Sequence, residues 1–280
     1  MAEKQLYDEV SFKSSELITK SYSTSFSLGI RFLNPKFREP IYNIYGFVRL
    51  ADEIVDSFHD YDKDALLWEF KKETFKAIEK KISLNPVLNS FQKTVNQYGI
   101  ENNLINAFLD SMEMDLHKQT HTQQSYQNYI FGSAEVVGLM CLKVFTNGDQ
   151  EMYHKLYEPA MRLGSAFQKI NFLRDLKEDS IALDRMYFPN IDFNSFDLAA
   201  KKEIEADILA DFQAGYEGIL KLPKTSRFGV YLAYIYYKAL LNKIKGIAPE
   251  KVSEERIRIP GFTKMLLLCN SYLRHNFNLL

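Results

Sequence analysis

Residues 41–56 read Ile41-Tyr-Asn-Ile-Tyr-Gly-Phe-Val-Arg-Leu-Ala-Asp-Glu-Ile-Val-Asp56, an apolar stretch that carries one line of polar side chains. Pro40 precedes it, and a proline at the first helical position loses no hydrogen bond, so we expect a helix that opens at Pro40. Tyr45, Arg49, Asp52 and Asp56 fall at i, i+4, i+7 and i+11, which places them on one face. The stretch predicts a mostly buried helix whose polar face is either a solvated ion-pair surface or part of a binding site.

A second stretch repeats this design. Residues 164–179 read Gly164-Ser-Ala-Phe-Gln-Lys-Ile-Asn-Phe-Leu-Arg-Asp-Leu-Lys-Glu-Asp179, with Gln168, Asn171, Asp175 and Asp179 at i, i+3, i+7 and i+11. Carboxylates one turn apart on each of two facing helices suit hard cations such as Mg²⁺, which keep positions open for water and substrate phosphate. The two stripes together predict a site for a diphosphate.

Softer metals are a weaker interpretation of the same sequence. His117 and His121 are the only histidines four residues apart, and we interpret both as surface residues of a loop rather than zinc ligands. Cys141 and Cys269 lie far apart and match no metal or redox spacing, which favours a reducing compartment.

The remaining sequence has a helical period and weak strand signals, so we expect an all-α fold in a single domain, residues 1–280. Residues 136–142 are apolar all round, which is typical of a central buried helix. The helices that we predict span residues 11–21, 41–58, 63–80, 86–98, 101–117, 124–146, 150–157, 159–178, 197–219 and 226–245, with a last one from about residue 260.

Charge and composition exclude several function classes. The formal charge of −1 over 280 residues provides no global basic field, so we expect no nucleic-acid partner. Residues 1–20 mix charged with apolar side chains and do not resemble a secretory signal. The apolar run at residues 265–269 is far shorter than the roughly 20 residues that a membrane-spanning helix needs, so we expect a cytoplasmic protein.

The two stripes lie in recognisable motifs. Tyr45-Gly-Phe-Val-Arg-Leu-Ala-Asp-Glu-Ile-Val-Asp56 resembles the first aspartate-rich motif of squalene/phytoene synthases, and Asn171-Phe-Leu-Arg-Asp-Leu-Lys-Glu-Asp179 resembles the second. Three further segments match that family in order: Ser23-Thr-Ser-Phe26, Met112-Glu-Met-Asp-Leu116 and Arg185-Met-Tyr-Phe-Pro189. The resemblance covers nearly the whole chain and is strongest to the bacterial phytoene synthase branch.

The chain departs from the family pattern at three places. Glu53 follows Asp52 where many members have a second aspartate, which keeps the carboxylate and leaves Asp52 and Asp56 in place. Residues 117–124 lack an Arg-Tyr pair that many members have. Ser133 and Glu135 stand where small or apolar residues are common, and whether Glu135 faces a cavity or a neighbouring cation stays open at this point.

By resemblance, the fold is an isoprenoid-synthase-type helical bundle around a central cavity. The resemblance implies Mg²⁺, with Mn²⁺ as an alternative, held by Asp52, Asp56, Asn171, Asp175 and Asp179. It implies that Asp52, Asp56, Asp175, Asp179, Tyr45 and Arg49 are catalytic, and that Ser25, Phe26, Arg49, Tyr129, Gln168, Asn171 and Arg174 bind substrate. The expected apolar walls are Phe26, Tyr45, Tyr129, Val137 and Tyr237.

The activity that the resemblance implies is head-to-head condensation of two allylic isoprenoid diphosphates. Our first expectation is phytoene from two geranylgeranyl diphosphates through a cyclopropyl diphosphate, for carotenoid biosynthesis and without NADPH. The alternative is squalene or dehydrosqualene from two farnesyl diphosphates. Head-to-tail prenyl transfer, terpene cyclisation and a non-catalytic assembly factor are further readings. Lipid-like substrates add the hypothesis of peripheral contact at the inner face of the membrane, and the sequence leaves the oligomeric state open.

Overall fold

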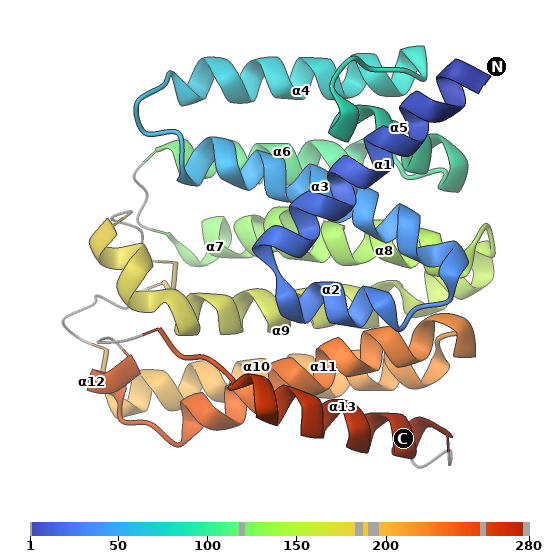
Figure 1. Ribbon diagram of the computed structural model, residues 1–280. Coiled ribbons are helices and arrows are strands. Elements are labelled where there is room, and N and C mark those ends of the chain that lie inside the picture. The colour runs from blue at the N-terminus through green and yellow to red at the C-terminus, as the bar shows by residue number, and fades with distance from the viewer. Residues whose placement is uncertain (1, 118–120, 183–186, 190–195, 253–255, 277–280) are drawn as a thin grey trace.

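The fold is a layered arrangement of helices in a computed structural model that describes residues 2–117, 121–182, 187–189, 196–252 and 256–276 (Figure 1). Every regular element in these ranges is helical, which confirms the all-α prediction. The elements are α1 (Ala2–Tyr22), α2 (Thr24–Arg31), α3 (Pro35–Asp56), α4 (Lys63–Lys80), α5 (Pro86–Tyr98), α6 (Asn102–Leu116), α7 (Gln123–Ile130), η1 (Phe131–Glu135), α8 (Val136–Thr146), α9 (Gln150–Ala182), α10 (Leu198–Lys221), α11 (Lys224–Lys245), α12 (Pro249–Val252) and α13 (Gly261–Asn276).

Two clusters of buried apolar side chains hold these layers together. The first joins α3, α4, α5, α6 and α8, and it contains a stack of Phe47 on Phe91 with ring centroids 3.9 Å apart. The second joins α9, α10 and α11. Helices α8 and α9 pack against each other between the two clusters, so both contribute to the middle of the molecule. Figure 1 shows α4 at one edge of the stack and α13 at the opposite edge.

Helices α4 and α5 have the predicted bounds because their ends carry local signals. The Asp62 carboxylate accepts a hydrogen bond from the Ala65 N–H, 3.0 Å away, and caps α4. Asn85 caps α5 and Pro86 occupies its first position. Gly99 ends α5 with a φ of +61°, a left-handed conformation that glycine adopts without strain.

Two helix boundaries that we predicted from prolines were wrong. Helix α3 begins at Pro35 rather than Pro40, because Asn34 caps it and Pro35 is an equally good first residue. Pro159 does not divide residues 150–178 into two helices, since α9 runs unbroken through it. Pro159 packs so closely on Gly218 of α10 that a Cβ added to the glycine would lie 2.4 Å from the proline Cβ, and we infer that this packing between helices offsets the hydrogen bond that proline loses. Helix α2 was not predicted, because eight residues are too few for a clear period.

The predicted helix at residues 124–146 contains a widened π-helical turn, η1. Within it, Gly132 packs so closely on α6 that an added Cβ would lie 2.5 Å from the backbone oxygen of Ala107 and 2.7 Å from the Ser111 Cβ. Such turns are often found at functional sites. Here the turn faces the cavity described below.

Replacing Gly132 with alanine should therefore destabilise the fold by roughly 1–3 kcal/mol, because the rigid backbone of α6 must move to admit the new methyl group. Urea unfolding followed by circular dichroism measures this free energy. Gly261→Ala is the matched control, since no atom lies within 4 Å of its added Cβ and its φ is ordinary. Equal stability of the two variants would contradict the prediction.

The continuous helical segment Gln123–Thr146 is, by length and composition alone, apolar enough to cross a membrane. It is the one such segment among the described residues, and 61% of its most apolar window is buried inside the bundle. We interpret it as the central buried helix that residues 136–142 predicted.

Candidate active site

A cavity of about 500 Å³ lies between α2, α3, α8, α9 and α11. The C-terminal ends of α3 and α9 lie at the same side of the molecule (Figure 1), and both aspartate motifs come from these ends. The charged side chains that line the cavity are Arg49, Asp52, Asp56, Asp115, Arg174, Asp175 and Arg256. The N-terminal parts of α3 and α9 add apolar lining, including Ile41 and Leu156, so the cavity combines a charged region with an apolar one.

Carboxylates outnumber cations around the first motif. Arg49 pairs with Glu53 and lies 3.8 Å from Asp52, and its guanidinium stacks on the Tyr22 ring, 4.2 Å from the centroid. Its Nε is buried and has no hydrogen-bond acceptor among the residues that the structure describes. An oxyanion in the cavity would supply that acceptor.

The excess of negative charge has its largest effect on the pKa of Asp52. Burial, followed by the charges of Asp56 and Asp115, raises the pKa of the Asp52 carboxyl from 3.8 to about 7, although Arg49 lowers it. Carboxylates that repel one another in this way are stabilised by a bound cation. Asp52, Asp56 and Asp115 are therefore the described carboxylates at this wall whose charge a cation could neutralise, although the three do not converge into a preformed metal site.

Around the second motif, positively charged groups outnumber carboxylates. Arg174 Nε lies 2.9 Å and 3.1 Å from the two oxygens of Asp175, and Arg256 Nε lies 2.9 Å from its Oδ1. Two guanidinium groups thus surround one carboxylate. The side chain of Asp179 lies outside the described residues, so its predicted role stays a prediction. This wall offers Arg174 and Arg256 to an anionic ligand.

Aromatic hydroxyl groups fix Asp115 at the cavity surface. Tyr129 donates to Oδ2 at 2.7 Å and Tyr187 donates to Oδ1 at 3.2 Å. Burial, and then Asp115, raise the pKa of Tyr129 well above its ordinary value, so this phenol stays a donor. His121 packs on Tyr187 with ring centroids 5.7 Å apart and on Tyr129 at 5.5 Å. His121, which we interpreted as a surface residue of a loop, lies outside the helices and is partly exposed, and contact with these rings buries the rest of it, which lowers its pKa.

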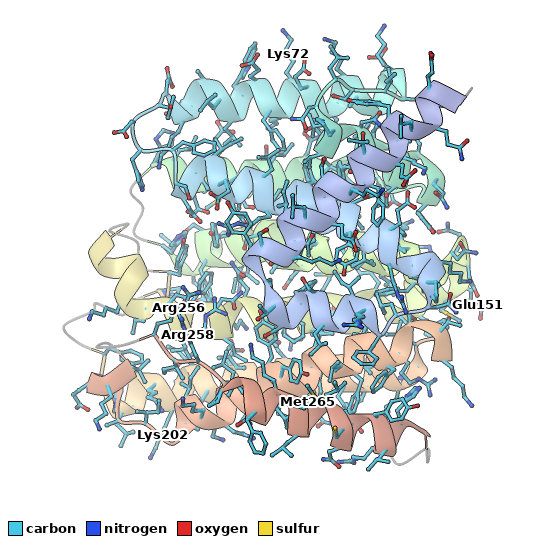
Figure 2. All side chains as sticks on the ribbon, viewed as in Figure 1. Lys72, Glu151, Lys202, Arg256, Arg258 and Met265 are labelled. Carbon is cyan, nitrogen blue, oxygen red and sulfur yellow. The ribbon has the colours of Figure 1, made fainter. Side chains whose placement is uncertain are left out.

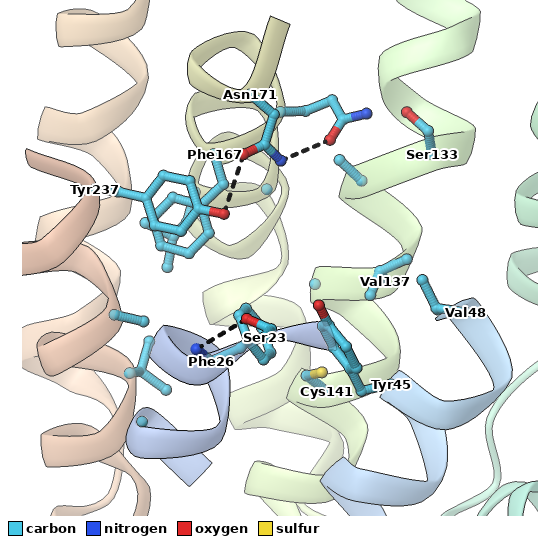
Figure 3. A pocket seen from close by; sticks show the side chains of 18 of the residues that line it. Ser23, Phe26, Tyr45, Val48, Ser133, Val137, Cys141, Phe167, Asn171 and Tyr237 are labelled. Atoms are coloured by element: carbon cyan, nitrogen blue, oxygen red, sulfur yellow. Dashed lines mark hydrogen bonds between the residues drawn. The ribbon is translucent and has the colours of Figure 1, made fainter. Parts of the chain in front are cut away.

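The polar stripe of α9 continues into a hydrogen-bonded chain (Figure 3). Tyr237 donates to Asn171 Oδ1 at 3.2 Å, and Asn171 Nδ2 donates to Gln168 Oε1 at 3.3 Å. The Tyr237 ring stacks on Phe167 with centroids 4.1 Å apart. Asn171 Oδ1 retains one lone pair, so its predicted role as a metal ligand stays open and untested.

The predicted apolar wall is present. Phe26, Tyr45, Tyr129, Val137 and Tyr237 all line the cavity. The Phe26 and Tyr45 rings lie 4.8 Å apart, and burial raises the pKa of Tyr45 to about 12. Ser25 is on α2 but is not among the residues that line the cavity, where Ser23 is found instead. Glu135 hydrogen-bonds Ser165 of α9 and does not line the cavity either.

Sequence reasoning missed three residues of this site. Asp115 lies in the Met112–Leu116 segment and Tyr187 in the segment that ends at Pro189, so both motifs carried a signal. From the sequence, Arg256 could either reach a phosphate or merely cover a surface, and only the fold, which brings it to Asp175, places it in the cavity.

The pKa of Asp52 predicts how stability depends on pH. The folded state holds the Asp52 proton up to about pH 7 and the unfolded chain releases it near 3.8, so the free energy of unfolding should fall as pH rises between these values. We expect a loss of roughly 1–3 kcal/mol, less than the full shift implies, because water reaches the cavity. Asp52→Asn should lack this slope. Urea unfolding in EDTA at several pH values tests it, and parallel stability curves for the two proteins would disprove it.

Comparison with known proteins gives consistent matches. The family model described as squalene/phytoene synthase matches residues 19–263. The 4,4'-diapophytoene synthase of Staphylococcus haemolyticus is 27% identical over 72% of this chain and 70% of its own length. The phytoene synthase of Arthrospira platensis is 26% identical over 94% of this chain and 93% of its own length. A crystal structure of a dehydrosqualene synthase superimposes with a TM-score of 0.82 at 22% identity, covering 96% of this chain and 98% of that one.

Proposed function

Since the chain belongs to the squalene/phytoene synthase family and is a prenyltransferase of the head-to-head condensing type, we propose that it forms phytoene from two molecules of geranylgeranyl diphosphate. The phytoene synthase of Arthrospira platensis supports this choice, because the match spans nearly the full length of both chains. The proposed reaction needs no reductant and serves carotenoid biosynthesis in the cytoplasm.

The observation that carries the proposal is the division of one cavity into a charged and an apolar region. A prenyl diphosphate has the same division, an anionic head and a hydrocarbon tail. Arg49, Arg174 and Arg256 line the charged region, and guanidinium groups match phosphate oxygens through paired hydrogen bonds. Apolar side chains, including Ile41, Phe145 and Leu156, line the rest of the cavity and offer a region that suits the tails.

The residues present fit the proposed Mg²⁺. The donors at the first wall are carboxylate oxygens whose mutual repulsion a cation would relieve. No three carboxylate, imidazole or thiolate groups converge within the described ranges, but Mg²⁺ commonly takes one or two carboxylates and completes its shell with water and phosphate. Asp52, Asp56 and Asp115 would hold it at the first wall, with Asn171, Asp175 and Asp179 as predicted additions. When bound, Mg²⁺ would stabilise the negative charge of the departing diphosphate.

The protein's own groups would act by orientation and by excluding water. The three arginines would hold the two diphosphates so that the allylic carbon of one molecule faces the double bond of the other. Loss of the first diphosphate gives an allylic cation, which that double bond attacks. Loss of a proton, which the departed diphosphate can accept, then closes the cyclopropane ring of the cyclopropyl diphosphate. Phe26, Tyr45 and Val137 line the part of the cavity in which the cation would form (Figure 3), and these apolar walls would keep water away from it. Tyr45 keeps its proton, because burial raises its pKa to about 12.

Product analysis tests the proposal. The purified protein is incubated with Mg²⁺ and either geranylgeranyl or farnesyl diphosphate, without NADPH, and the extracted hydrocarbon is identified by mass spectrometry. We expect phytoene from the first substrate. No hydrocarbon from either substrate, even after NADPH is added, would refute the enzyme assignment and favour the assembly-factor reading.

A second candidate is dehydrosqualene formed from two farnesyl diphosphates. The specific observation in its favour is the 27% identity to a diapophytoene synthase, which is similar to the identity to the phytoene synthase. Dehydrosqualene as the preferred product in the same experiment would replace phytoene by this candidate. Squalene formed only with NADPH would show that the protein delivers a hydride.

A further inference from the structure

Helix α13 has an apolar face that points away from the protein. Phe262, Met265, Leu266, Cys269 and Leu273 are exposed and fall at i, i+3, i+4, i+7 and i+11, so they form one stripe, which we call the α13 stripe. Phe262 is 76% exposed and Met265 57%. Figure 2 labels Met265 on this helix, which lies at one edge of the stack of helices in Figure 1. Surface helices of soluble domains usually present polar side chains here, so the stripe suggests a partner surface.

The opposite face of α13 is already occupied by the protein. Tyr236 of α11 donates a hydrogen bond to the Lys264 carbonyl oxygen at 3.0 Å, and Phe228 packs against Tyr272 and His275. Ser271, in the middle of this inner face, is buried. The helix is therefore held firmly by α11, and its stripe is left outward.

Positive charge surrounds the stripe at both ends. Residues 224–280 contain ten lysine and arginine residues and three acidic ones, a formal charge of +7 in a chain whose total is −1. Helix α13 itself contains no acidic residue. The cations of the helix itself are Lys264 near its start and Arg274 near its end. Arg256 and Arg258 precede the helix and are exposed (Figure 2).

We propose that the α13 stripe docks the protein on an anionic membrane surface, with α13 lying flat among the lipid headgroups. Bulky apolar side chains flanked by cations and free of acidic neighbours are the composition of helices that bind such surfaces. A membrane is favoured over a protein partner because the proposed substrates and product are lipid-like, so this inference rests on the proposed function. Arg256, which comes five residues before α13, lines the charged region of the cavity, so the start of α13 lies near that region.

Vesicle flotation tests the surface without any substrate. The wild-type protein should float with vesicles made of equal parts phosphatidylglycerol and phosphatidylcholine, float less with phosphatidylcholine alone, and detach as salt increases. The double variant Met265→Glu and Leu266→Glu should bind at least about tenfold more weakly. The matched control, Trp68→Glu with Leu84→Glu, changes two exposed apolar residues elsewhere and should bind like wild type. Because both variants change only exposed side chains outside the cavity, we expect unchanged activity in detergent.

A fluorescence measurement locates the contact. Trp68, the single tryptophan, is exposed on α4 at the opposite edge from α13 (Figure 1), so brominated lipid should not quench it. In the Trp68→Phe background, Phe262→Trp should be quenched and shifted to shorter wavelength when vesicles are added. Tryptophan at position 262 that stays unquenched on bound protein would overturn the proposal.

Other outcomes also decide against it. The α13 stripe would be refuted as the docking surface if the wild-type protein bound neither type of vesicle. It would also be refuted if the glutamate double variant floated as well as the wild type. Light scattering that shows a wild-type dimer and a monomeric glutamate variant would assign the stripe to a second copy of the chain. Since flotation needs no turnover, loss of the proposed activity and loss of membrane binding are read separately.

Discussion

Replacing Asp52 with asparagine should lower the rate of hydrocarbon formation on the order of a thousandfold, the largest effect that we expect from one substitution. Asparagine has nearly the same shape but carries no charge, so the wall formed with Asp56 and Asp115 would hold a cation less tightly. The fold should persist, because the change relieves repulsion from Asp56 and Asp115 and gives up only a 3.8 Å ion pair with Arg49, which keeps Glu53 as a partner. Single-turnover product formation at saturating Mg²⁺ measures the rate, and circular dichroism measures the fold.

Asp110→Asn is the matched control for this prediction. Asp110 is an exposed carboxylate on α6 that pairs with Lys71 and does not line the cavity. Its variant should keep wild-type turnover, since a surface ion pair contributes little. An Asp52→Asn protein that is folded and turns over at a similar rate to the Asp110→Asn protein would show that the first motif does not serve catalysis.

The stripe on α3 was predictable because helical geometry alone aligns its members. Tyr45, Arg49, Asp52 and Asp56 needed only their spacing to be placed on one face, and all four line the cavity. Gln168, Asn171 and Asp175 followed from the same rule. Local end signals also predicted α4 and α5, since Asp62, Asn85 and Gly99 act on their immediate neighbours.

What failed depends on contacts between distant parts of the chain. The continuity of α9 through Pro159 requires α10, and the π-helical turn at Gly132 requires the close surface of α6. The contact of the His121 ring with Tyr187, far along the sequence, also depends on the fold. The local charge at the two motifs could not be predicted from the sequence either. The excess of carboxylates near Asp52 includes Asp115, and the excess of guanidinium groups near Asp175 includes Arg256, and only the fold brings these residues to the motifs.

Among the residues that only the fold brings to the cavity, Arg256 is the one whose replacement we expect to lower activity most. Arg256→Ala should lower kcat/KM for the prenyl diphosphate on the order of a hundredfold. Its guanidinium lies 2.9 Å from Asp175 and lines the cavity beside Arg174, so its loss removes one of the charged donors available to a diphosphate. The larger share of the effect should be on KM, because binding of the diphosphate precedes its departure. Steady-state kinetics over a range of substrate and Mg²⁺ concentrations measures both parameters.

Arg258→Ala provides a close comparison two residues along the chain. Arg258 is also exposed, but it does not line the cavity, and its described contact is a backbone one, in which Lys243 donates to its carbonyl oxygen at 2.8 Å. If positive charge near the cavity acted only by attracting anionic substrate from a distance, both variants would lose similar activity and added salt would remove the difference. A direct contact predicts that Arg256→Ala alone is impaired and that its deficit persists in high salt, because a hydrogen-bonded ion pair inside a cavity is screened much less than charges in water.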